Sequence, residues 1–179
     1  MAQPPADAAQ PTPQTLMRLT RGLTIVSTVA LWAAGIGLVA MTAAIGWQIY
    51  GRYMLNDTPH WTERFSTFIM VYYILFAAAV GVRERVHIGL VFLRDRLPRR
   101  GRLAVEIATN ALIVGFGLTL AWYGGVLTEA RWNQTIPTLG LPTGMSYLPF
   151  PVAGVLMAVF SLENILHAVM GEEGKRGWN

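Results

Sequence analysis

Cysteine is absent from the 179-residue sequence, and charged side chains are scarce. The lack of cysteine excludes disulfides and thiolate metal sites. Charged residues make up 13% of the chain, against about a quarter in soluble globular domains, whereas hydrophobic residues make up 53% and the mean hydropathy is +0.41. This composition is typical of a protein that crosses a lipid bilayer several times. We attribute the formal net charge of +4 to arginines that face anionic headgroups, so no nucleic-acid partner is expected.

The charges are clustered, and the long segments between the clusters are apolar. We predict an all-α membrane protein with four transmembrane helices, because each segment is long enough to cross a hydrocarbon core of about 30 Å. The predicted spans cover about residues 23–50, 61–82, 103–127 and 143–167. Together they form one membrane domain over residues 18–170, between an N-terminal tail predicted to be disordered (1–17) and a polar C-terminal tail (171–179).

The first apolar segment is predicted to stay in the protein as a helix. From Gly22 to Gly51 the sequence contains no charged residue. That length far exceeds the apolar core of a cleaved signal peptide, which has about 7–15 residues. A retained, tilted helix is therefore favoured over the alternative of a signal peptide.

The segment Gly81–Arg102 joins the second and third spans and holds seven of the fourteen Lys and Arg residues. Apolar side chains fall on one side of this segment and basic ones on the other, so we predict a short amphipathic helix on the membrane surface that ends at Pro98. Short basic loops stay in the cytoplasm. With four spans, eleven basic residues lie on the side of the two termini and three on the other side. Both termini are therefore predicted to be cytoplasmic.

Three polar residues near the span ends are candidates for a structural or docking role: Arg52, Glu63 and His87. Arg52 and Glu63 close the first hairpin at the outer surface, where one interpretation is a fixed ion pair or a contact with an extracytoplasmic partner. The other is that Glu63 complements the N-terminus of its helix while Arg52 reaches to the headgroups. His87 either orients the surface helix by bonding to a neighbouring helix or lies among the headgroups.

Small residues and prolines give two further predictions about helix packing. Gly117, Ala121 and Gly125 recur every four positions in the third span, and such a row lets another helix pack closely against it. Pro149 and Pro151 fall early in the fourth span, where they predict a kink or a late start of the helix.

Chemistry within the membrane is not expected from this sequence. All charged residues fall at the ends of the predicted spans, and no buried carboxylate is expected. A transporter that works alone usually needs an ionisable group near the bilayer midplane, so autonomous transport is not predicted. Tyr72 and Tyr73 lie near the middle of the second span, where their hydroxyls need partners on other helices.

Enzyme and cofactor signatures are also missing. The sequence has no G-x-S-x-G, H-E-x-x-H or P-loop pattern, so we expect no enzyme. Its three histidines, His60, His87 and His167, lie near span ends and cannot hold haem groups across the bilayer. A single site built from His87 and His167 at the inner surface is the alternative to two ordinary interfacial histidines. We therefore expect no cofactor and no metal.

Four short motifs occur in a fixed order along residues 18–170. They are G-R-Y at the end of the first span, W-T-E at the start of the second, G-V-R-E-x-x-H-I at its exit, and L-P-x-G-x-x-Y-x-x-x-P before the fourth. This order and spacing resembles the small membrane subunit of tripartite ATP-independent periplasmic (TRAP) transporters. The family usually has two acidic residues after W-T, and here the second is Arg64.

The resemblance implies partners rather than an active site. In such systems a periplasmic solute-binding protein delivers an organic acid to a large membrane subunit, which carries it with sodium across the bacterial inner membrane. The small subunit implied here scaffolds the large one and helps to dock the solute-binding protein. The resemblance marks Arg52, Glu63 and His87 as motif positions with structural or docking roles. The alternative is a stand-alone four-helix membrane scaffold or adaptor without a transport role.

Overall fold

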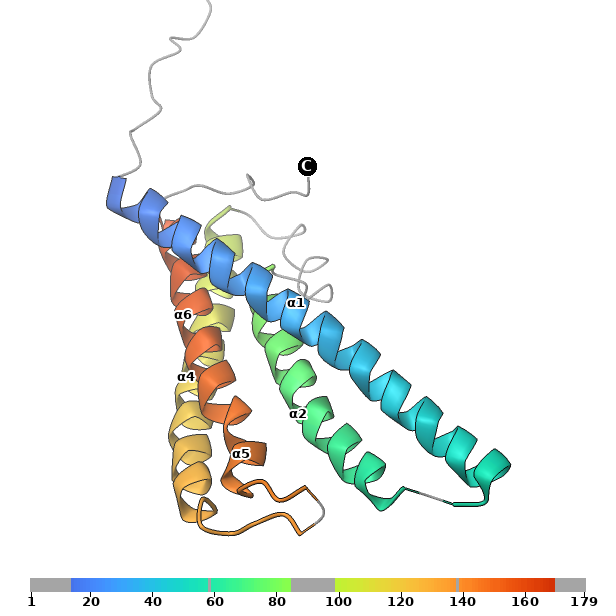
Figure 1. The fold of residues 1–179 in the computed structure, drawn as a ribbon. Coiled ribbons are helices and arrows are strands. Elements are labelled where there is room, and N and C mark those ends of the chain that lie inside the picture. The colour runs from blue at the N-terminus through green and yellow to red at the C-terminus, as the bar shows by residue number, and fades with distance from the viewer. Residues whose placement is uncertain (1–13, 58, 85–98, 138, 170–179) are drawn as a thin grey trace, which may run out of the picture.

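The structure is a computed structural model that describes residues 14–57, 59–84, 99–137 and 139–169. This part of the chain is helical apart from turns and one isolated antiparallel bridge between Thr135 and Pro142. The elements are α1 (Gln14–Tyr50), the π-helical turn η1 (Gly51–Leu55), α2 (His60–Arg83), α4 (Arg99–Ala130), α5 (Gly144–Tyr147) and α6 (Pro149–Val169) (Figure 1). Four helical segments are long and apolar enough to cross a membrane, which confirms the predicted all-α membrane fold.

The N-terminal boundary differs from the prediction. α1 begins at Gln14, inside the tail that was predicted to be disordered. The segment from Gln14 to Gly22 contains no proline and includes Leu, Met and Arg, which favour a helix.

The predicted surface helix and His87 fall on residues 85–98, and the C-terminal tail falls on 170–179. Both segments lie outside the described residues.

The turn between α1 and α2 depends on a glycine. A Cβ added at Gly51 would lie 2.9 Å from the carbonyl oxygen of Asp57, so a larger residue would displace the turn. Asn56 then adopts a left-handed backbone conformation with φ of 51°, which ends the helix. Pro59 precedes α2, and its carbonyl accepts a hydrogen bond from Thr62 Oγ1 at 2.7 Å. We call this end of the molecule the η1 end.

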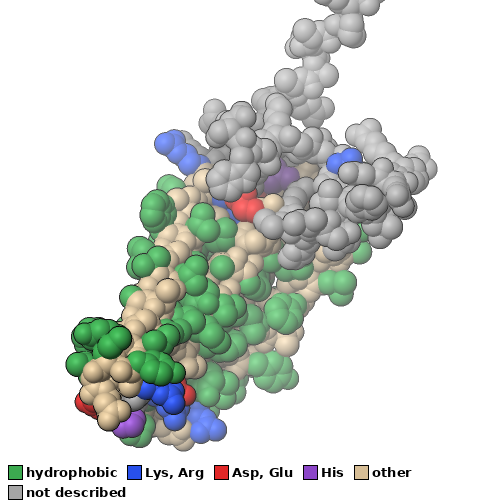
Figure 2. Space-filling view, turned by 90° about the vertical axis from the view of Figure 1, so that its right-hand side faces the viewer, with side chains coloured by type: hydrophobic (Ala, Val, Ile, Leu, Met, Phe, Trp, Pro, Cys, Tyr) green, Lys and Arg blue, Asp and Glu red, His purple; other side chains and the backbone are tan. Residues whose placement is uncertain are grey.

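The helices form two hairpins that meet through α2 and α6 (Figure 1). α6 packs on α4 on one side and on α2 on the other, while α1 packs mainly on α2. The buried apolar core lies at the contact of α2 and α6 and consists of Ala79, Val82, Met157 and Phe160. Figure 2 shows hydrophobic side chains over the middle of the visible face and charged ones toward its two ends, as a membrane protein requires.

α4 and α6 approach each other through glycine and alanine. A Cβ added at Gly154 would lie 2.6 Å from both the backbone nitrogen of Ala121 and the carbonyl oxygen of Gly117. Two members of the predicted small-residue face, Gly117 and Ala121, therefore pack against α6 of the same chain. A Cβ at Gly125 would meet nothing within 4 Å, whereas one at Gly124 would lie 2.7 Å from an α6 side chain. Gly124 thus takes the place on this face that the sequence assigned to Gly125.

The fourth span is broken near its start. The short helix α5 ends at Tyr147, and α6 begins at Pro149, which confirms the late helix start predicted from the two prolines. Proline fits the first turn of a helix because the N–H groups there have no partner inside the helix. Gly144 lets α5 approach α4, since a Cβ there would lie 2.7 Å from the carbonyl oxygen of Thr128.

Candidate functional site

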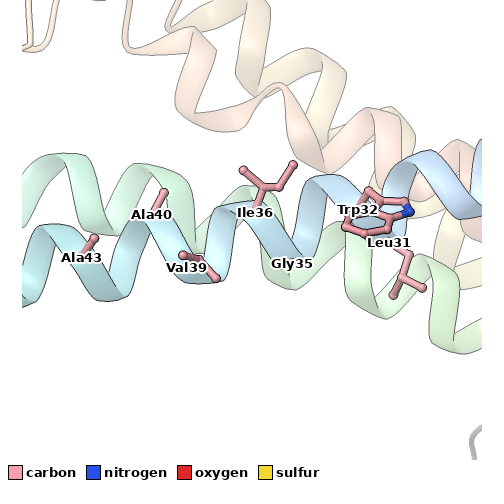
Figure 3. Close-up of a pocket in the computed structure, with 7 residues that line it drawn as sticks. All are labelled: Leu31, Trp32, Gly35, Ile36, Val39, Ala40 and Ala43. Atoms are coloured by element: carbon pink, nitrogen blue, oxygen red, sulfur yellow. The ribbon is translucent and has the colours of Figure 1, made fainter.

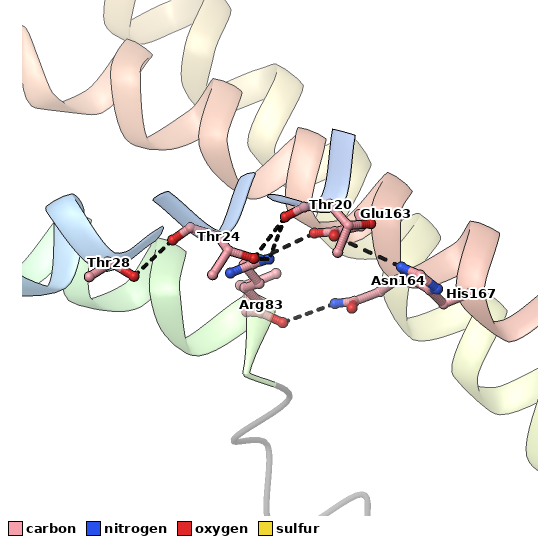
Figure 4. A network of polar contacts seen from close by, with 8 residues as sticks. Thr20, Thr24, Thr28, Arg83, Glu163, Asn164 and His167 are labelled. Carbon is pink, nitrogen blue, oxygen red and sulfur yellow. Dashed lines mark hydrogen bonds and ion pairs between the residues drawn. The ribbon is translucent and has the colours of Figure 1, made fainter. Parts of the chain in front are cut away.

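A buried polar cluster lies at the end of the bundle opposite η1, and we call this the Arg83 end (Figure 4). Arg83 is the last residue of α2, and it is only 6% exposed. Its Nε donates a hydrogen bond to Oε2 of Glu163 on α6 at 3.2 Å. Its Nη2 donates to Oγ1 of Thr24 on α1 at 2.7 Å and lies 3.4 Å from the carbonyl oxygen of Thr20. One guanidinium group therefore joins three helices.

α6 contributes three polar side chains to this cluster. Glu163 is buried, and Nε2 of His167, one helical turn further on, lies 3.9 Å from its Oε1. Asn164 is 2% exposed and donates through Nδ2 to the carbonyl oxygen of Val82 at 3.1 Å. The last carbonyls of a helix need partners from outside it. Asn164 supplies such a partner to α2, so α6 binds the end of α2 through both a charge and an amide.

Several contacts offset the cost of burying the Arg83 charge. A buried ion costs several kcal/mol unless it is paired and hydrogen-bonded, and Arg83 has an ion pair and a hydroxyl acceptor. Its Cζ lies 5.6 Å from the centroid of the Phe160 ring, within reach of a cation–π interaction. A positive charge at the C-terminus of α2 also interacts favourably with the helix dipole. The cluster therefore holds helix ends together through charge-assisted hydrogen bonds.

A second polar contact joins the hairpins nearer the η1 end. The hydroxyl of Tyr72 on α2 donates to the carbonyl oxygen of Met145 on α5 at 2.7 Å. This contact confirms the prediction for Tyr72. The hydroxyl of Tyr73, for which a partner on another helix was also predicted, forms no hydrogen bond within the described residues. The Tyr72 ring also packs against Phe68 and Phe76, with ring centroids 4.9 and 6.2 Å apart. Polar contacts thus connect the two hairpins at two levels along the bundle.

The family follows from a comparison with known proteins. A family model described as "Tripartite ATP-independent periplasmic transporters, DctQ component" matches residues 41–171. The chain belongs to this family. It is a small permease subunit of a TRAP transporter, a multi-pass membrane component of a transport system and not an enzyme. The resemblance drawn from the four motifs is confirmed.

Individual relatives agree with the family model. The chain is 28% identical over 131 residues to "Sialic acid TRAP transporter small permease protein SiaQ" of Vibrio cholerae, which covers 73% of this chain and 75% of that protein. It is 32% identical over 100 residues to "C4-dicarboxylate TRAP transporter small permease protein DctQ" of Rhodobacter capsulatus, covering 54% and 44%. It is also 29% identical over 137 residues to "Isethionate TRAP transporter permease protein DctMQ" of Oleidesulfovibrio alaskensis, covering 72% of this chain and 22% of that protein.

The expectation that no carboxylate is buried is wrong. Glu163 and Glu106 are 6% and 9% exposed. Each lies near the end of its helix, as expected, but both are buried, and Arg83 pairs with Glu163 across 80 positions of sequence. A signal was present, because Glu163 is the single Asp, Glu, Lys or Arg residue between Pro149 and Val169. A lone carboxylate in an apolar helix needs a buried partner.

The candidate residues at the η1 end lie apart from this cluster. Arg52 is exposed in η1, and Glu63 is exposed in the first turn of α2. Within the described residues their side chains form no ion pair with each other. The position of Glu63 suits the positive end of the α2 dipole. By contrast Arg83, which belongs to the G-V-R-E-x-x-H-I motif of this family, was not singled out and is the centre of the network.

The alternative of a single ligand site built from His87 and His167 gains no further ligating residues from the part of the chain that the structure describes. That part contains no cluster of three or more His, Cys, Asp or Glu residues able to hold a metal ion. His87 lies outside it. His167 is directed toward Glu163 in the polar cluster (Figure 4).

Proposed function

We propose that this chain is the scaffold of a TRAP transporter in a bacterial inner membrane, where it binds a large permease subunit. In this proposal the large subunit performs sodium-coupled uptake of an organic acid, and the small subunit helps to dock the periplasmic solute-binding protein. Family membership carries the proposal. The buried polar groups support it, because Arg83, Glu163 and Asn164 are engaged with protein groups that hold helices together. They supply a rigid frame rather than a solute path.

The relatives support the choice of partner and of solute class. The region like this chain makes up 22% of the isethionate permease, so in that protein it is continuous with a much longer polypeptide. This continuity favours a large permease polypeptide as the partner of the small subunit. Three relatives are named for sialic acid, C4-dicarboxylates and isethionate. All three solutes carry an acidic group, which favours an organic anion as the transported solute.

Co-purification and uptake test this proposal. When the tagged small subunit is expressed with the large permease subunit of its own transporter, we expect the two to purify from detergent in about equal amounts. Deleting the small subunit should abolish uptake even when the large subunit and the solute-binding protein are present. Recovery of the small chain alone, with uptake intact after its deletion, would favour the stand-alone scaffold instead.

The proposed orientation, with both termini in the cytoplasm, has its own test. The start of α1, the end of α2, the start of α4 and the end of α6 share the Arg83 end (Figure 1). The basic segment 81–102 joins the end of α2 to the start of α4 in the sequence, so the positive-inside rule assigns the Arg83 end to the cytoplasm. Alkaline phosphatase fused after Arg102 should be inactive, whereas a matched fusion after Gln134 should be active. The reverse pattern of activity would overturn the orientation.

A further inference from the structure

One face of α1 is left uncovered by the other residues that the structure describes. α1 packs on α2 through Ala30, Ala34 and Ala44, which are buried, and through Gly37, where a Cβ would lie 3.0 Å from Cβ of Tyr73. Val39 follows Ala30 by nine positions, or about two and a half turns, so the two residues lie on opposite sides of the helix. The face that contains Val39 therefore points away from α2, and Val39 is 69% exposed.

This uncovered face contains an apolar groove of about 620 Å³ (Figure 3). Among the described residues, only residues of α1 line this groove, and they include Trp32, Gly35, Ile36, Val39 and Ala43. The groove is empty above Gly35, because a Cβ added at this residue would meet nothing within 4 Å. The groove lies inside the uncharged run from Gly22 to Gly51, and its occupant must therefore be buried in the hydrocarbon region.

The position of Trp32 favours a protein helix over lipid as the occupant of this groove. Trp32 lies ten positions, or about 15 Å, into the uncharged run, well inside a hydrocarbon core of about 30 Å. Its side chain is 70% exposed, and its indole N–H makes no hydrogen bond to any described residue. Tryptophans on lipid-facing surfaces gather at the membrane interface, where the N–H finds an acceptor. Acyl chains supply no acceptor at the depth of Trp32, whereas a neighbouring helix offers carbonyl and hydroxyl groups.

We propose that this face of α1 binds a transmembrane helix of the large permease subunit, which accepts a hydrogen bond from the indole N–H of Trp32. The inference rests on the proposed function and adds which surface of the small subunit forms the interface. α1 suits this role because it stands at the margin of the bundle, with α2 as its main neighbour. The continuous polypeptide of the isethionate permease favours a large subunit over a second copy of this chain.

Photo-crosslinking in membranes tests the occupant directly. The chain has no cysteine, so Val39→Cys gives a unique site for a benzophenone maleimide, and Leu118→Cys on α4, at a residue 58% exposed, is the matched control. With the large subunit co-expressed, we expect the label at position 39 to form adducts with it at least about tenfold more often than the label at 118. Adducts with a second copy of the chain, or with lipid alone, would overturn this inference.

Two substitutions test the geometry of the groove. Gly35→Leu should lower recovery of the large subunit about tenfold, because the new side chain fills the groove, whereas Gly115→Leu, also in open space, should leave recovery unchanged. Trp32→Phe removes only the hydrogen-bond donor and should lower recovery of the large subunit about threefold. This factor corresponds to the typical free energy of one hydrogen bond between membrane helices. Equal recovery from all variants, with the wild-type pair still co-purifying, would reject the α1 interface alone. Failure of the wild-type pair to co-purify would reject the proposed function as well.

Discussion

Glu163→Leu is expected to destabilise the protein by about 3–5 kcal/mol, because it leaves the charge of Arg83 buried without its ion-pair partner. Both side chains are almost completely covered, at 5% and 6% exposed, so solvent screens the pair very little. The loss should separate α6 from α2 at the Arg83 end, where the guanidinium also binds Thr24 of α1. The measurement is the free energy of unfolding by sodium dodecyl sulfate in mixed micelles, followed by circular dichroism.

A matched control and a double variant make this result specific. Glu129→Leu makes the same chemical change at an exposed residue of α4 and should alter the free energy of unfolding by less than about 0.5 kcal/mol. Arg83→Met combined with Glu163→Leu removes both charges and should recover most of the lost stability, since an apolar pair carries no desolvation cost. If Glu163→Leu unfolds like Glu129→Leu, the ion pair does not hold the hairpins together.

The sequence was sufficient to predict the helices because the tendency of a segment to cross a membrane depends on its own composition. The four apolar segments became the four long helices, and Pro149 set the start of α6. The hydrogen bond of Tyr72 was predictable because a hydroxyl within an apolar span needs an acceptor, but the same rule predicted a partner for the neighbouring Tyr73, which has none within the described residues. The sequence could not show that α6 stands between α4 and α2, because this depends on which helix faces fit together.

The polar cluster escaped prediction for a related reason. Arg83 and Glu163 each lie near a helix end, where a charged residue normally reaches the headgroups. Their burial follows only from the packing of α6 on α2, which brings together positions 80 residues apart.

The third member of the small-residue face of α4 was predicted one residue too late in the sequence. With 3.6 residues per turn, Gly124 lies about 20° around the helix from Gly117, whereas Gly125 lies about 80° from it.

Gly154→Leu is expected to destabilise the protein by about 3 kcal/mol or more. Even the first side-chain carbon would lie 2.6 Å from the carbonyl oxygen of Gly117 and from the backbone nitrogen of Ala121. Backbone atoms of a packed helix cannot move aside as a flexible side chain can, so α4 and α6 must separate. The same unfolding titration measures the effect. Because α6 also carries Glu163, the separation should weaken the contact of α6 with α2 as well.

The control for this variant is on the same helix pair. Gly125→Leu adds an equal side chain at a position where a Cβ meets nothing within 4 Å, so it should change the free energy of unfolding by less than about 0.5 kcal/mol. Gly124→Leu should behave like Gly154→Leu, because its Cβ would lie 2.9 Å from the backbone nitrogen of Pro151. A large loss from Gly125→Leu together with tolerance of Gly124→Leu would mean that α4 is rotated by about one residue, or 100°, from this structure. The face of α4 that meets α6 would then be the one that the four-residue spacing suggests.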